Sequence, residues 1–144
     1  MNKIYSIPLI ILITWSVLAL LGPILPLHPD QISLEKILLT PNWTQWFGHD
    51  DLGRSISARL IMGARTSLSV AIVVVSISLI IGTFIGMMGA WLGGYWDKAL
   101  VMVIDLFIAF PGILLAIALA GLLGPGIMNA VIALSIVSWV GFAR

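Results

Sequence analysis

The sequence predicts an all-helical integral membrane protein, and three observations lead to this fold class. Of the 144 residues, 60% are hydrophobic and only 9% are charged, whereas about 25% are charged in a soluble domain. The mean hydropathy is +1.15. Three long apolar stretches each exceed the roughly 20 residues with which a helix crosses the hydrocarbon core, where an open strand cannot satisfy its backbone.

The first two apolar stretches each predict one span. Residues 7–27 carry no charge, and Pro23 and Pro26 mark the end of the helix. A cleaved signal peptide is the alternative for this stretch, but no A-x-A site follows it, so an uncleaved anchor span is favoured. Residues 66–96 also carry no charge, and they predict a second span at about 67–90.

The third apolar stretch, residues 99–143, is too long for one crossing, because as one helix it would extend about 67 Å at about 1.5 Å per residue. The GLLGPG sequence at 121–126 supplies a break, which predicts spans at about 100–122 and 127–142. Four spans place both termini on the same side of the membrane. The positive-inside rule leaves the orientation open, because with a cytoplasmic N-terminus the inside carries three bases and the outer loop carries four, which four acids in that loop balance.

Charges gather immediately before the second span, in the segment GHDDLGRSISARLIMGARTSL. Apolar residues recur there at every fourth position from Leu52 to Leu68, which predicts an amphipathic helix. We expect this helix to lie in the membrane interface, with an N-terminal aspartate cap and with its last arginine at the boundary. The charges would either anchor the segment at the surface or pair across a subunit interface. The charged residues are Asp50, Asp51, Arg54, Arg59 and Arg65.

Three features of the predicted spans suggest packing or a pathway. A stripe of small residues on the second span predicts close helix packing, and it consists of Gly82, Gly86, Gly89 and Gly93. Asp105 is a carboxylate within a predicted span, which marks a candidate functional site, although a structural role is favoured because the spans contain no second charged group. Pro111 should kink the third span, as a hinge or as part of a pathway.

The composition excludes several kinds of chemistry. The chain has no cysteine, and its net charge of +1 does not indicate nucleic-acid binding. It contains no P-loop, no HExxH motif and no paired carboxylates. His28 and His49 are far apart in the sequence and have no clustered partners for a metal site. We therefore expect no cofactor, no metal and no catalytic residues.

The charged segment resembles the signature of the permease subunits of peptide and nickel ABC importers, which reads approximately G-T-D-x-x-G-R-D-x-x-S-R-L-x-x-G-A-R-x-S-L. His49, Ser55 and Ala58 depart from it. Asp105 and Pro111 fall in a second family pattern, D-x-x-x-M-R-x-x-D-x-x-x-A-F-P, and the final SWVGFAR is similar to W-x-x-Y-A-R. The matching positions of the first signature are Gly48, Asp50, Gly53, Arg54, Arg59, Leu60, Gly63, Ala64, Arg65, Ser67 and Leu68.

The resemblance implies an incomplete type-1 ABC importer transmembrane domain at 66–144, preceded by an anchor span and an external loop at 1–65. It implies a bacterial inner (plasma) membrane location and a cytoplasmic N-terminus. The implied partners are a homologous second permease, two ATP-binding subunits that hydrolyse ATP, and an extracytoplasmic substrate-binding protein that docks near the charged segment. Di- or oligopeptides are the implied cargo, with nickel next.

The resemblance also implies a longer protein, because the loop that couples these permeases to their ATPases would begin just after Arg144. We therefore expect a fragment, or a truncated form that lacks this coupling loop. A second function remains open from a different class, namely a small helical membrane protein that anchors or assembles a complex without transport. An intramembrane enzyme is disfavoured because no catalytic cluster is present.

Overall fold

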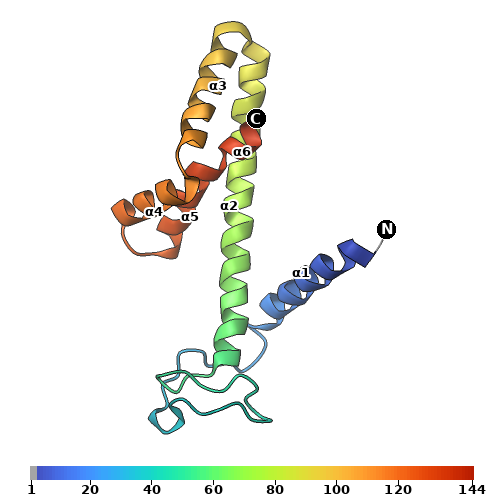
Figure 1. The fold of residues 1–144 in the computed structure, drawn as a ribbon, viewed down its shortest axis with the longest axis vertical. Coiled ribbons are helices and arrows are strands. Elements are labelled where there is room, and N and C mark those ends of the chain that lie inside the picture. The colour runs from blue at the N-terminus through green and yellow to red at the C-terminus, as the bar shows by residue number, and fades with distance from the viewer. Residues whose placement is uncertain (1–2) are drawn as a thin grey trace. The chain divides into compact units, whose positions relative to one another are not determined.

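The computed structural model describes residues 3–144, and the side chains from residue 7 onward. Helices dominate this part of the chain, and it forms no strand beyond an isolated bridge between His49 and Ser55. The predicted all-helical class is thus confirmed. The elements are α1 (Lys3–Leu21), the short 3₁₀ helix η1 (Leu34–Lys36), α2 (Ile56–Leu92), α3 (Gly94–Ala109), α4 (Gly112–Leu123), α5 (Ile127–Ser138) and α6 (Val140–Ala143) (Figure 1).

The chain forms two compact units, Met1–Ser69 and Val70–Arg144. The boundary falls within α2, so the first turns of this helix belong to the first unit and the rest belongs to the second. The first unit also contains α1 and the long loop that carries η1. In the second unit the chain turns back after α2, so that α3 runs along its end, and α4 and α5 follow as a helical pair (Figure 1).

Among the described residues, α2 is the one helix that is long and apolar enough to cross a membrane by itself. Helices α3 and α4 reach that length only together, and their axes are bent by 86°. The apolar helical stretches Ile7–Leu21 and Ile127–Ala143 are shorter. One clear span is therefore established by length and composition, and the predicted total of four spans stays a prediction.

The third predicted span, 100–122, is divided in the structure into α3 and α4. Phe110 has φ −94° and ψ 139°, an extended conformation that the ring of a following proline favours. Pro111 has no N–H to continue the hydrogen-bond ladder of α3. It instead begins the next helix, where its carbonyl oxygen accepts a hydrogen bond from the Leu114 N–H at 2.9 Å. The structure thus has a sharp break where the sequence predicted a kink.

The amphipathic segment also differs from the prediction. It is the beginning of α2 and continues without interruption into the apolar part, so the amphipathic segment does not form a helix of its own. The 37 residues of α2 extend about 55 Å at about 1.5 Å per residue. The reason is local, because no proline interrupts the sequence between Ile56 and Leu92. The helix begins at Ile56, and not at Leu52, because Gly53 has φ +71°.

The glycine stripe of α2 marks the close contacts of the second unit. A Cβ atom on Gly82 would lie 2.7 Å from Cβ of Phe142 and would also meet the carbonyl oxygen of Trp139. A Cβ on Gly86 would meet the backbone of Ala143. Only glycine therefore allows α2 to approach the last helical turns of the chain this closely.

The other two glycines of the stripe have different roles. A Cβ atom on Gly89 would meet the side chain of Leu100 on α3, so this glycine also allows close packing. Gly93 has no atom within 4 Å of such a position, but its φ is +60°. This left-handed conformation costs little only in glycine. Gly93 is thus a turn residue between α2 and α3.

We expect Gly82→Ala to destabilise the second unit, because the added methyl group has no space. Overpacking of this kind costs about 1–3 kcal/mol. Gly63→Ala is the matched control on the same helix, because a Cβ atom there would meet nothing within 4 Å. The control should raise stability by about 0.5–1 kcal/mol through helix propensity. Thermal unfolding of both variants in detergent tests this, and equal effects would contradict the packing role of Gly82.

Candidate functional site

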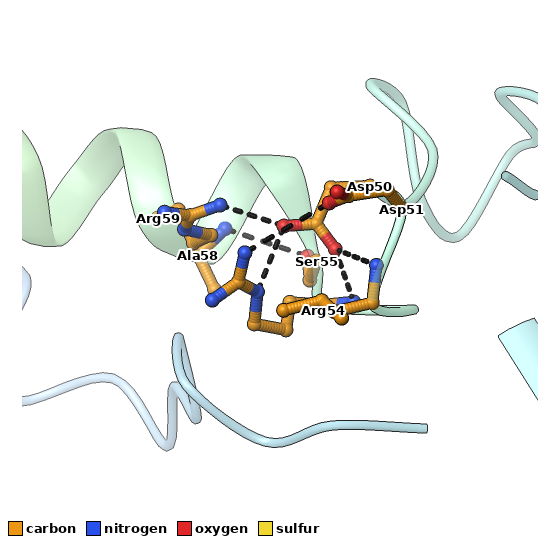
Figure 2. Close-up of polar contacts among 7 residues, drawn as sticks. Asp50, Asp51, Arg54, Ser55, Ala58 and Arg59 are labelled. Carbon is orange, nitrogen blue, oxygen red and sulfur yellow. Dashed lines mark hydrogen bonds and ion pairs between the residues drawn. The ribbon is translucent and has the colours of Figure 1, made fainter. Parts of the chain in front are cut away.

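The charged segment folds around one carboxylate, that of Asp50 (Figure 2). Its Oδ1 accepts hydrogen bonds from the backbone N–H groups of Leu52 at 3.0 Å and Arg54 at 2.9 Å. Its Oδ2 accepts hydrogen bonds from Nε of Arg54 at 2.8 Å and from NH1 of Arg59 at 2.6 Å. The loop before α2 and the first turn of α2 are thereby joined through a single side chain.

The members of this cluster differ in exposure. The Asp50 side chain is 14% exposed and that of Arg54 is 20% exposed, whereas Arg59 is 45% exposed. Asp51 is 82% exposed, and its carboxylate lies 4.0 Å from the guanidinium of Arg54. Asp51 therefore contributes little, because exposed ion pairs are weak and screened by salt. Within the chain, Asp50 pairs with Arg54 and Arg59. Membrane anchoring and pairing across a subunit interface, the two roles predicted for this segment, stay predictions.

The hydrogen bonds set the protonation state of Asp50. Desolvation raises the pKa of this carboxyl, but the backbone N–H groups of Arg54 and Leu52 and the two guanidinium groups lower it more. The net result is a pKa of about 2, below the ordinary value of 3.8. Asp50 thus stays ionised at neutral pH. Since both oxygens are occupied, it is poorly suited to accept a proton as a general base.

Ser55, and not Asp50 or Asp51, caps the N-terminus of α2. Its Oγ accepts a weak hydrogen bond from the N–H of Ala58 at 3.4 Å and donates one to Oε1 of Gln45 at 2.8 Å. The predicted aspartate cap is therefore wrong, because the helix begins after the turn that Asp50 stabilises. Sequence reasoning could have found Ser55, since a serine directly before an apolar helical pattern is a common capping signal. Nothing local in the sequence indicated Gln45.

Two glycines of the segment are required by backbone conformation. Gly48 has φ +68° and Gly53 has φ +71°. A Cβ atom at Gly48 would meet the carbonyl oxygen of Leu39, and one at Gly53 would meet that of Ser33. The loop passes so close to itself at these points that a side chain has no space. The segment is therefore a folded loop and not a flexible linker.

The remaining candidate residues lie apart from this cluster. Arg65 is exposed on α2, beyond the ion pairs that Asp50 makes. Asp105 is exposed on α3, while its neighbour Ile104 is buried. The structure thus brings together Asp50, Gly53, Arg54 and Arg59, and it does not bring Arg65 to them within the first unit.

The sequence of this chain is similar to those of several named transport proteins. No protein-family model matches the chain. The dipeptide transport system permease protein DppC of Alkalihalophilus pseudofirmus is 38% identical over 99% of this chain and 47% of the relative. DppC of Bacillus subtilis is 36% identical over 99% of the chain and 45% of the relative. The glutathione transport system permease protein GsiD of Escherichia coli strain 536 is 44% identical over 72% of the chain and 34% of the relative.

These relatives are all permease proteins of transport systems, which is the class that the apolar helices and the charged segment indicate. Over 99% of its length the chain is similar to permease proteins of dipeptide transport systems. The resemblance inferred from the sequence motifs is thereby confirmed. The chain spans about half the length of the DppC relatives that it matches.

We expect the stability that Asp50 provides to depend on pH. Its pKa is lowered in the folded state, so the stabilisation is complete above about pH 4 and is lost as the pH falls through about 2. Asp50→Asn should unfold at a lower temperature than the wild type at neutral pH. The difference between the two should shrink as the pH falls from 4 to 2. Thermal unfolding in detergent across this pH range is the measurement.

Asp51→Asn is the matched control, because Asp51 is the neighbouring carboxylate and is largely exposed. It should change the free energy of unfolding by no more than about 0.5 kcal/mol at neutral pH, as surface substitutions usually do. If both variants behaved alike, the cluster around Asp50 would not be what holds the loop to α2.

Proposed function

We propose that this chain is part of the translocation pathway of an ABC importer for small peptides. The observation that carries the proposal is the 38% identity to a dipeptide transport permease over 99% of the chain. The glutathione permease supports the same cargo class, because glutathione is itself a small peptide. These relatives give no support to nickel, which the sequence analysis left as an alternative cargo.

The proposed partners are a homologous second permease, two ATP-binding subunits, and an extracytoplasmic substrate-binding protein. The chain itself is proposed to be a transport subunit and not an enzyme. ATP would be hydrolysed by the ATP-binding subunits, and the pathway would form between the two permeases in alternating access. The ion pairs around Asp50 support a structural role for the charged segment, in which a rigid loop presents one face to a docking protein.

The proposed setting is the bacterial inner membrane, crossed several times, with a cytoplasmic N-terminus. Helix α2 and the shorter apolar helices support such a setting. The loop from 28 to 55 would then lie outside, and the turn between α2 and α3 would lie inside. The glycine stripe supports a helix surrounded by protein on one face, as in a bundle of spans.

Dipeptide uptake tests the proposed function. In a strain from which this gene is deleted, we expect uptake of a labelled dipeptide to fall to background and to return when the locus is restored. Uptake of a free amino acid serves as the control and should not change. Unchanged dipeptide uptake would overturn the proposal. If a membrane complex then failed to assemble, the anchoring function would be supported instead.

The orientation can be tested by single-cysteine labelling, because the chain has no cysteine of its own. We expect Glu35→Cys, in η1, to react with a membrane-impermeant maleimide in intact cells. Tyr95→Cys, in the turn after α2, should react only after the membrane is permeabilised. Both side chains are exposed, so the two positions form a matched pair. The reverse pattern of labelling would overturn the proposed orientation.

A further inference from the structure

A polar cavity of about 220 Å³ lies within the first unit, between the loop and the N-terminus of α2. Segments from distant parts of the loop contribute to its walls. The lining consists of Pro26, Leu27, His28, Gln31, Ser33, Lys36, Gln45, His49, Gly53, Ser55 and Ala58. The volume is several times that of a water molecule, which occupies about 30 Å³ in the liquid.

The titratable side chains that line this cavity are all basic. Its titratable side chains are His28, Lys36 and His49, all of them bases, and no carboxylate lines the cavity. Asp30, Glu35 and Asp50 each adjoin a lining residue in the sequence without lining the cavity, and the oxygens of Asp50 are occupied by hydrogen bonds from Leu52, Arg54 and Arg59. A metal cation would find no negative charge here, whereas an anion would find a lysine ammonium and two imidazoles.

His49 is the unusual member of this lining. Its side chain is only 9% exposed, and its Nδ1 is buried without a hydrogen-bond partner in the structure. A buried polar atom without a partner costs about 1–3 kcal/mol, so such atoms call for an explanation. His49 is also a departure from the family signature, in which this position is threonine. The family pattern therefore does not account for it.

Gln45 adds a hydrogen-bond donor to the lining. Oε1 of Gln45 accepts the hydrogen bond from Oγ of Ser55 at 2.8 Å, so the amide NH₂ of Gln45 is the group that remains. Ser55 caps the N-terminus of α2 and Ala58 lies in its first turn, where the helix dipole places partial positive charge. The Ser55 hydroxyl and the Ala58 N–H already donate hydrogen bonds within the chain, so this helix end contributes its dipole, which favours an oxyanion.

We propose that this cavity binds a small oxyanion, a carboxylate or a phosphate, between Lys36, His49 and the N-terminus of α2. Lys36 supplies the charge, His28 and His49 supply N–H donors from opposite segments of the loop, and Gln45 supplies its amide. The carboxylate could be the C-terminus of a peptide, which rests on the proposed function, or a free anion, which does not. Both share the chemistry that the lining recognises.

The test is a titration of the full chain in nanodiscs, followed by the imidazole signals of ¹⁵N-histidine. The chain has only two histidines, so the spectrum is simple. The probes are inorganic phosphate, acetate, dialanine and dialanine amide at constant pH. We expect a saturable shift of the His49 signals with at least one of these oxyanions and none with the amide.

Lys36→Gln should weaken binding about tenfold, because it removes a charge-assisted hydrogen bond. Its side chain is exposed, so the fold should not depend on it. Lys98→Gln is the matched control, since Lys98 is an exposed lysine outside this cavity, and it should leave binding unchanged.

The outcomes separate the two sources of the anion. Binding of dialanine, without binding of its amide, would identify a peptide carboxylate. Binding of phosphate or acetate without dialanine would identify a free anion and would leave the transport proposal untouched. Shifts that do not saturate with any probe, or that are the same in Lys36→Gln, would overturn the proposal, and the cavity would then hold only water. The titration needs no transport, so failed uptake would not be mistaken for failed binding.

Discussion

The carboxylate of Asp50 joins the loop before α2 to the first turn of this helix, because it gathers four N–H donors from three other residues. The backbone of the same stretch is paired as well. The Leu38 N–H donates to the carbonyl oxygen of Asp50 at 3.1 Å, and the His49 N–H donates to that of Leu39 at 3.1 Å. The loop cannot move away from α2 without separating the Asp50 carboxylate from the guanidinium of Arg59. This constraint fixes where α2 begins, and it places His49 and Ser55 around the polar cavity.

The family signature in this segment acquires a physical meaning from that arrangement. Gly48 and Gly53 occupy left-handed positions where the loop touches itself. Asp50 supplies the acceptor, and Arg54 and Arg59 supply the donors. The residues of the signature therefore stabilise the folded loop itself, whether or not the loop also contacts another protein. A partner that docks here would meet a rigid surface, which lowers the entropy that binding must overcome.

The second unit depends on a different constraint, which is close approach of helices. Lipid tails are as apolar as leucine, so helices in a membrane gain little from burying apolar side chains against one another. Gly82 and Gly86 remove the side chains that would separate α2 from the end of the chain. Ser78, one turn before Gly82, is fully buried on the same helix. The packing of α2 in this unit thus depends on small residues that allow close approach, and not on large buried apolar side chains.

The sequence by itself determined the helical class, the apolar stretches, three of the four packing glycines and the resemblance to transport permeases, because these depend on composition, spacing and local motifs. It could not determine the partner of each charge. Asp50 bonds Arg59 nine positions along the chain, and Ser55 bonds Gln45 ten positions back. Such contacts depend on the folded path of the loop, and the periodicity of apolar residues in the sequence does not predict that path. The sequence thus misplaced the helix cap, and it treated His49 as an isolated residue. Only the tertiary structure placed His49, Lys36 and His28 around one cavity, because segments distant in the sequence meet there.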